Sequence, residues 1–146
     1  MIEATLIASG INKIAGCDEA GRGPCAGPLV VAAVILNFPL AEELTQIKDS
    51  KELSETLRNK LFDEITERAL AYSIIEISVA EIDANGLHKS NLEGMRRAVK
   101  ALSITPDYVL TDGYAIDGID IPSLAVWKGD QVAVSVGAAS ILAKVY

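Results

Sequence analysis

Two apolar segments dominate the first quarter of the chain. Residues 11–17 and 28–36 predict strands, and the second contains an uninterrupted apolar run from Leu29 to Leu36. A strand without a polar face is typical of one that is buried on both sides of a sheet. Because the connection between the two strands is short, we expect them to pair antiparallel.

A helical pattern follows this pair of strands. Apolar positions that recur every four residues predict a helix from about Ser54, whose side chain is a suitable N-cap. These positions are Leu57, Leu61, Ile65 and Ala69. The segment before the helix, 37–53, is predicted to be a loop, and the segment after it, 71–79, is predicted to be a strand.

Two capping boxes predict further helix starts. Ser78 and Glu81 open a short helix that Gly86 closes, and Ser90 and Glu93 open a second helix. The second helix carries an apolar stripe. The stripe consists of Leu92, Met95, Val99 and Leu102.

The last third of the chain again combines strands with a helix. Residues 108–110 and 121–126 predict short strands, and 132–146 predicts a helix because its apolar positions have helical spacing. The whole order is strand, strand, helix, strand, helices, strand, strand, helix. It predicts one α/β domain over residues 1–146, with a mixed central sheet and helices on its faces.

Composition and charge narrow the class of protein. Half of the residues are apolar, which excludes a disordered chain and supplies a core for one domain. No apolar run is long enough to span a membrane, and the N-terminus lacks the regions of a signal peptide. We therefore expect a cytoplasmic protein without a membrane partner, whose oligomeric state the sequence does not set. The net charge of −7 argues against a nucleic-acid partner unless bound cations offset part of it.

The chain contains two cysteines, Cys17 and Cys25. Neither has the spacing of a zinc site. In a reducing compartment, free thiols are expected rather than a disulfide.

Carboxylates come directly after three of the predicted strands. Asp18 and Glu19 follow the first strand, and Asp112 and Asp130 follow the two strands of the last third. Each group alone is typical of a solvated loop or a turn. Together they form a candidate site for a hard divalent cation, because open α/β sheets usually place their sites at strand ends. Since side chains alternate along a strand, Asp18 and Glu19 can share a site only if the strand ends or bends there.

A glycine-rich turn, Gly21-Arg22-Gly23, follows the paired carboxylates. Glycines allow a backbone to approach a ligand closely, and an arginine can bind a phosphate. The turn lacks the spacing and the following helix of a dinucleotide-binding loop, so a plain hairpin loop is the alternative. Lys48 and Lys51 either extend a phosphate-binding path from Arg22 or are ordinary solvated lysines.

Several segments, in order along the chain, resemble the bacterial ribonuclease HII family. They are 18–24 (DEAGRGP), 49–54 (DSKELS), 91–98 (NLEGMRRA), 112–113 (DG), 128–130 (KGD) and 138–145 (AASILAKV). So many matches in one order are more specific than any single motif. The resemblance covers nearly the whole chain.

The resemblance implies an RNase H-like fold, a chemistry and a set of site residues. It implies that Asp18, Glu19, Asp112 and Asp130 are both catalytic and metal-binding, with Mg²⁺ or Mn²⁺ as the cofactor. The implied reaction is endonucleolytic hydrolysis of the RNA strand in RNA–DNA hybrids, including single ribonucleotides embedded in duplex DNA. It leaves 5′-phosphate and 3′-hydroxyl ends. The Gly-Arg-Gly turn is implied to recognise the ribose 2′-hydroxyl, which distinguishes RNA from DNA. The implied substrate contacts are Gly21, Arg22, Gly23, Lys48, Lys51, Ser140 and Lys144.

One departure from the family is at the C-terminus. Family members continue past the Ala-Lys-Val segment with further helices and a tyrosine that packs on the sugar at the RNA–DNA junction. We expect Tyr146 to occupy a different position, and the chain to lack that C-terminal helical part. Two alternatives therefore stand beside the ribonuclease. One is a folded chain that binds metal or nucleic acid with little or no turnover, and the other is an RNase H-fold nuclease that acts on DNA.

Overall fold

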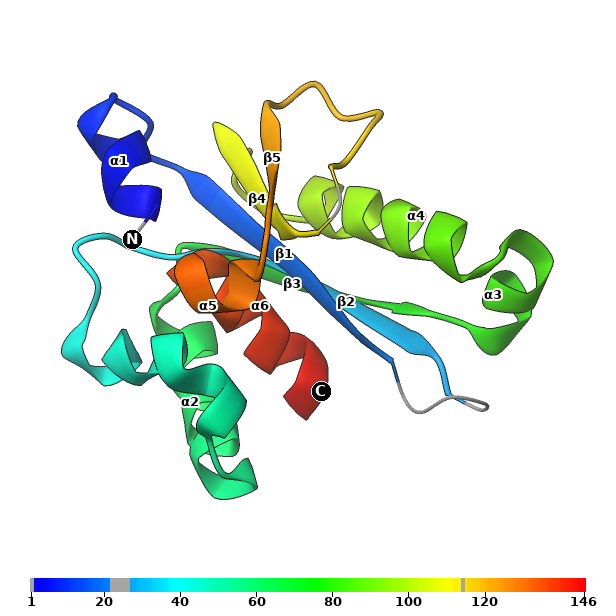
Figure 1. The fold of residues 1–146 in the computed structure, drawn as a ribbon, viewed down its shortest axis with the longest axis horizontal. Helices are drawn as coiled ribbons and strands as arrows, with labels where there is room; N and C mark the ends of the chain where they lie inside the picture. Colours follow the sequence, from blue (N-terminus) through cyan, green and yellow to red (C-terminus); the bar gives the residue numbers. More distant parts are fainter. Residues whose placement is uncertain (1, 22–26, 114) are drawn as a thin grey trace.

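A single mixed sheet of five strands organises the molecule. The structure is a computed structural model that describes residues 2–21, 27–113 and 115–146, and the side chains of these residues except 48–52. The strands lie in the order β3-β2-β1-β4-β5 (Figure 1). Their bounds are β1 Ile14–Gly21, β2 Leu29–Ile35, β3 Ala71–Ile77, β4 Tyr108–Asp112 and β5 Ser123–Val126.

Strand β1 lies at the centre of the sheet and joins its two halves. It pairs antiparallel with β2, from Ala15 opposite Ile35 to Gly21 opposite Leu29. On its other side it pairs parallel with β4, which in turn pairs parallel with β5. β2 pairs antiparallel with β3. The predicted antiparallel pair and the predicted mixed sheet are both confirmed.

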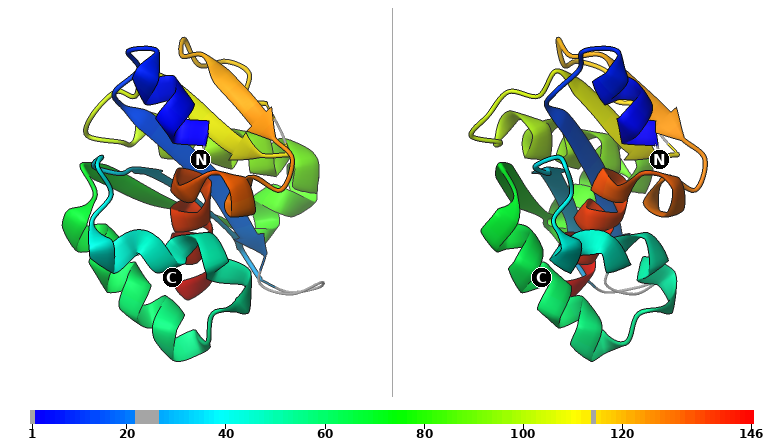
Figure 2. Two further views of the ribbon diagram at one scale, coloured as in Figure 1. Left: turned by 60° about the vertical axis from the view of Figure 1, so that its left-hand side comes forward. Right: turned by 90° about the vertical axis from the view of Figure 1, so that its left-hand side faces the viewer.

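Helices cover both faces of the sheet. α6 and α2 lie on one face and α4 lies on the other, as the views of Figures 1 and 2 agree. The helical bounds are α1 Ile2–Ala8, η1 Glu42–Glu52 (a 3₁₀ helix), α2 Glu55–Arg68, α3 Val79–Asn85, α4 Leu87–Lys100, α5 Gly129–Val132 and α6 Val134–Val145. Along the described residues, none of these helices has the length and apolar character needed to cross a bilayer.

The apolar run of β2 divides between two cores. Val31 and Ile35 pack in the core that contains Met95 of α4, whereas Val30 and Val34 pack with α2 and α6 on the opposite face. Every residue of β2 is buried, which confirms the prediction of a strand without a polar face. Alternation of side chains along a strand produces this division.

Helix α6 packs directly on the backbone of β1. A Cβ atom placed on Gly16 would lie 2.1 Å from the backbone carbon of Ser135, so only a glycine permits this approach. The same end of α6 is held by Glu3, whose buried carboxylate accepts a hydrogen bond of 2.7 Å from the Ser135 backbone N–H. A negative charge at a helix N-terminus is stabilising. α1, β1 and α6 are therefore tied together beside the centre of the sheet.

Several predicted boundaries agree with the structure. Ser54 caps α2 by accepting the backbone N–H of Leu57, and Ser78 caps α3 by accepting that of Glu81. Gly86, with φ of 86°, ends α3 as predicted. α4, however, starts at Leu87 with no side-chain cap, so the predicted helix start at Ser90 is wrong. The left-handed region favours glycine, and Gly86 therefore serves as the junction between two consecutive helices.

Other segments differ from the predictions. The predicted loop 37–53 contains the 3₁₀ helix η1. The helix predicted over 132–146 begins only at Val134, because Val132 ends α5 and the backbone of Ala133 is extended. The N-terminal helix α1 was not predicted. A helix of seven residues with little sequence signal is stabilised mainly by the contacts it makes in the folded protein.

Candidate active site

The centre of the candidate site is the pair Asp18 and Glu19. The prediction that the first strand ends at residue 17 is wrong, because β1 continues through both carboxylates to Gly21. Asp18 is only 7% exposed, and its Oδ1 accepts a hydrogen bond of 2.9 Å from the Glu19 backbone N–H. Although alternation directs the two residues toward opposite faces, the charge of Glu19 raises the pKa of Asp18, so the two carboxyl groups interact electrostatically. The predicted strand end is therefore not needed for the two groups to interact.

Glu19 reaches the face of the sheet that α4 covers. It lines one pocket together with Asn91, which is 6% exposed on the second turn of α4 and which opposes the rise in the pKa of Glu19. Among the described atoms, Glu19 Oε2 and Asn91 Oδ1 are buried and have no hydrogen-bond partner. A buried oxygen without a donor is costly, so two unmatched acceptors side by side point to a missing cation or donor.

Asn91 is a site residue that the pattern of the sequence did not identify. It was recognised only as part of a family-like segment, and the capping-box interpretation placed it at a helix start. A polar residue on the buried face of an amphipathic helix is the signal that could have found it, since buried polar groups need partners.

Asp112 joins the pair from the neighbouring strand. It is the last residue of β4, and the parallel register that sets Cys17 beside Thr111 places Asp112 next to Asp18. Its Oδ1 accepts a hydrogen bond of 3.0 Å from the Gly129 backbone N–H. The Asp112 charge raises the pKa of both Asp18 and Glu19, although burial is the largest cause of each shift. The structure thus brings three of the four predicted carboxylates into one electrostatic group.

Asp130 is placed differently from the prediction. It lies not at a strand end but inside the short helix α5, where it is 7% exposed. Its neighbour Gly129 is the residue that donates to Asp112, so α5 is anchored to the end of β4. This anchor places the fourth carboxylate on an element attached to Asp112, one of the other three.

The electrostatics of the group fit a divalent cation. Burial, and then the charge of Glu19, raise the pKa of Asp18 to about 8. Burial likewise raises the pKa of Glu19. Clustered carboxylates stay ionised together only with a compensating positive charge. In the described part of the chain, no three side chains of aspartate, glutamate, histidine or cysteine lie close enough together to coordinate an ion. Ion binding therefore requires the carboxylates to move closer to one another.

The raised pKa of Asp18 predicts a pH dependence of stability in protein without divalent cations. Below about pH 4, Asp18 is protonated in the folded and the unfolded state. Between there and about pH 8 the folded state retains a proton that the unfolded chain releases, so the free energy of unfolding falls as the pH rises. Denaturant unfolding in EDTA across this range measures the loss. We expect the free energy of unfolding of Asp18→Asn to fall less over this pH range than that of the wild type. Added Mg²⁺ should reduce the fall in the wild type. An equal pH dependence in the variant and the wild type would contradict the assignment.

The predicted substrate contacts fall into three groups. Gly21 is exposed at the end of β1, and it lines a pocket of about 390 Å³ together with Glu19 and Asn91. Lys144 is exposed near the end of α6, whereas Ser140 is 1% exposed inside that helix, a burial that does not support contact with a substrate. The remaining predicted contacts lie outside the described residues or side chains. These are Arg22, Gly23, Lys48 and Lys51.

Cys17 is a free thiol, as predicted, and it is buried next to the site. Burial is the main cause that raises its pKa, with the charges of Asp18 and Glu19 adding to it. A thiol in this environment stays protonated and unreactive. Cys25 lies outside the described residues.

The fold and the acidic group at β1 and β4 define a class, and comparison with known proteins identifies the family. The chain is similar to the crystal structure of ribonuclease H2 from Pyrococcus horikoshii OT3, with a TM-score of 0.80 and 32% identity over 91% of this chain and 71% of that one. Its fold is also similar to that of Bst-RNase HIII in complex with Mn²⁺, with a TM-score of 0.73 and 23% identity over 91% of this chain and 51% of that one. The RNase H-like fold is therefore confirmed.

A sequence model of the family described as Ribonuclease HII matches residues 15–146. The chain is 51% identical over 144 residues to ribonuclease HII of Salinispora arenicola, covering 99% of this chain and 54% of that protein. It is 53% identical to ribonuclease HII of Nocardia farcinica, of which it covers 57%. The chain belongs to the ribonuclease HII family, and it spans a little over half the length of these two relatives.

Proposed function

We propose that this chain is the catalytic part of a metal-dependent endoribonuclease. It hydrolyses the RNA strand of RNA–DNA hybrids and cleaves duplex DNA at single embedded ribonucleotides, leaving 5′-phosphate and 3′-hydroxyl ends. The observation that carries the proposal is the shared electrostatic group of Asp18, Glu19 and Asp112 on paired strands, in a chain of the ribonuclease HII family.

The residues of the proposed site have distinct roles. Asp18, Glu19, Asp112 and Asp130 supply oxygen ligands for Mg²⁺ or Mn²⁺, the hard cations that carboxylates prefer. A bound cation of this kind polarises a phosphodiester and offsets the charge of the attacking and leaving oxygens. The Mn²⁺ complex of the related Bst-RNase HIII is consistent with this choice of metal.

The fold of the chain sets the starting positions of these ligands. The β1–β4 register sets Asp18 beside Asp112, and the Gly129 N–H holds the Asp112 carboxylate in one orientation. Asn91 of α4 lines the same pocket as Glu19 and opposes the rise in its pKa. The backbone thus sets the positions from which these carboxylates close in on a cation.

Three duplexes test the proposed function directly. The chain is incubated with Mg²⁺ or Mn²⁺ and an RNA–DNA hybrid, a DNA duplex with one ribonucleotide, or an all-DNA duplex. We expect cleavage of the first two only, with products that a ligase accepts because they carry 5′-phosphate and 3′-hydroxyl ends. Cleavage of the all-DNA duplex would establish the alternative nuclease. Cation binding by calorimetry without single-turnover cleavage would establish the binding-only alternative.

Gly21 provides a test of ribose recognition. A Cβ atom at Gly21 would meet none of the described atoms within 4 Å, so Gly21→Ala is expected to leave the fold intact. The added methyl group would obstruct close approach of a ribose to the backbone. We expect kcat/KM on the one-ribonucleotide duplex to fall about 10- to 100-fold, because small misplacements at a reacting centre are costly. Calorimetry should show unchanged cation affinity; equal losses of both would make the turn a support for the metal site.

A further inference from the structure

The turn between β5 and α5 carries the most exposed aromatic side chain among the described residues. Trp127 is the only tryptophan of the chain, and it is 82% exposed. Large aromatic rings usually contribute their area to a core or an interface. Neither the predicted fold nor the carboxylate site gives this ring a role.

The turn is fixed to the candidate site on both sides of Trp127. On one side, Val126 pairs with Asp112 in the sheet, and its carbonyl accepts a hydrogen bond of 3.3 Å from the Gly113 N–H. On the other side, the Gly129 N–H donates to the Asp112 carboxylate. The indole therefore protrudes from a short segment with two anchored ends. Val126 is attached to Asp112 and Gly113, and Gly129 is attached to the Asp112 carboxylate.

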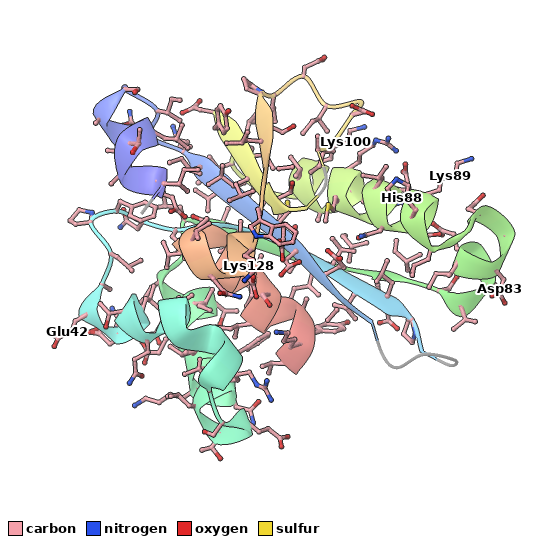
Figure 3. All side chains as sticks on the ribbon, in the orientation of Figure 1. Glu42, Asp83, His88, Lys89, Lys100 and Lys128 are labelled. Atoms are coloured by element: carbon pink, nitrogen blue, oxygen red, sulfur yellow. The ribbon has the colours of Figure 1, made fainter. Side chains whose placement is uncertain are left out.

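Lys128, the residue between these anchors, has an uncommon backbone conformation. Its φ of 52° and ψ of 45° lie in the left-handed region, where L-residues other than asparagine, aspartate and glycine are rare. Lys128 is exposed at the junction of β5 and α5, whereas Lys89 and Lys100 lie along α4 (Figure 3). Sparsely populated conformations concentrate at functional sites, where the surrounding contacts maintain them.

We propose that the Trp127–Lys128 turn binds the sugar–phosphate backbone of the duplex whose scissile phosphodiester lies at the carboxylates. Lys128 pairs with a phosphate, and the indole of Trp127 packs on a neighbouring sugar. This inference rests on the proposed function and adds a substrate contact to it.

The charges of the site favour a nucleic acid as the partner. A polyanion that approaches Asp18, Glu19 and Asp112 needs positive charge beside them, and Lys128 provides it on the segment attached to Asp112. An aromatic face next to a cation is the usual combination in proteins that bind single-stranded nucleic acids without reading sequence, and the same two groups can contact a sugar and its phosphate. A rigid, protruding ring also suits the wide, shallow minor groove of an A-form duplex, where sugars are accessible.

Trp127 is itself the probe for a direct test. The chain is titrated with RNA–DNA hybrid in EDTA, where metal-assisted hydrolysis is absent, while tryptophan emission and the anisotropy of a labelled hybrid are recorded. We expect emission typical of a solvent-exposed indole in the free protein and a change in emission that saturates together with the anisotropy. We expect Trp127→Ala to weaken binding about tenfold and Trp127→Phe to recover most of it.

A second variant tests the charge. Asparagine tolerates the left-handed region, so Lys128→Asn removes the ammonium without adding backbone strain. One lost phosphate contact should weaken binding about five- to tenfold near 0.1 M salt and reduce the salt slope by about one. Tyr72→Ala on the edge strand β3 and Lys100→Asn on α4 are matched controls, since both side chains are exposed away from the site. Both controls should bind like the wild type.

The outcomes separate the two proposals. If the wild type binds and cleaves the hybrid while Trp127→Ala and Lys128→Asn bind equally well, the turn is not a substrate contact and the proposed function stands. If the free protein already shows blue-shifted emission that the hybrid does not change, another protein surface covers the ring and the inference is overturned. If the wild type neither binds nor cleaves the hybrid, both proposals fail.

Discussion

Replacing Asp18 by asparagine is expected to abolish hydrolysis while leaving the fold intact. Asp18 is buried between Glu19 and Asp112, so its charge contributes directly to any cation held by the three carboxylates. Loss of a residue that merely orients a metal ligand typically costs 10- to 100-fold. We therefore expect at least about a hundredfold loss of turnover at saturating Mg²⁺ for Asp18→Asn, and a similar loss for Asp112→Asn.

The same substitution should stabilise the protein in the absence of cations. The asparagine carries no carboxylate that burial and the charge of Glu19 would destabilise. The denaturant midpoint of unfolding in EDTA at neutral pH should therefore rise. Asp83→Asn is the matched control, because Asp83 is an exposed carboxylate of α3, a helix that contributes no residue to the site (Figure 3). It should change neither turnover nor stability. Near-normal turnover of Asp18→Asn at saturating Mg²⁺ would falsify the role of this residue.

The largest effect on stability is expected from Gly16→Ala. The new Cβ atom would lie 2.1 Å from the Ser135 carbonyl carbon and 2.5 Å from the Val136 nitrogen. These are backbone atoms, so no side chain can turn aside, and α6 must move away from β1. Overpacking a core costs about 1–3 kcal/mol and occasionally more, and we expect the upper end of that range or beyond.

Denaturant unfolding measures this cost, with Gly21→Ala as the control in the same strand. No described atom lies within 4 Å of the place where a Cβ on Gly21 would stand, so its substitution should change the free energy of unfolding by less than about 0.5 kcal/mol. Because α6 adjoins α5, displacement of α6 should also weaken cation binding. Similar stability of the two variants would show that α6 does not need the close approach at Gly16.

The sequence was most informative where one physical requirement determined the pattern. The uninterrupted apolar run of β2 indicated burial on both faces, and the structure confirms it. Ser54 and Ser78 marked helix starts correctly because a side-chain oxygen accepts an otherwise unpaired N–H there. Ser90 fits the same motif but lies inside α4, because that helix starts at Leu87, directly after its N-cap Gly86. Local motifs thus compete, and the fold selects one of them.

The candidate site could be predicted only in part for a similar reason. Asp18, Glu19 and Asp112 were identifiable because carboxylates next to buried strands are conspicuous. Their interaction depends on the parallel pairing of β1 with β4, which no local pattern specifies. Asn91 was missed as a site residue because Glu19, beside which it lies, is distant in sequence. Asp130 was expected at a strand end because no sequence pattern marks the helix that starts directly after Lys128.

The parallel pairing of β1 with β4 also determines when the site can form. At the start of the pairing, the backbone N–H of Lys13 donates to the carboxylate of Asp107, 94 positions further along the chain. Contacts of such long sequence separation form slowly, because a long loop must close before they gain any stability. A nascent chain therefore exposes Asp18 and Glu19 well before Asp112 has been synthesised. We therefore expect assembly of the three-carboxylate group to be a late step of folding, with cation affinity as a kinetic reporter of the completed topology.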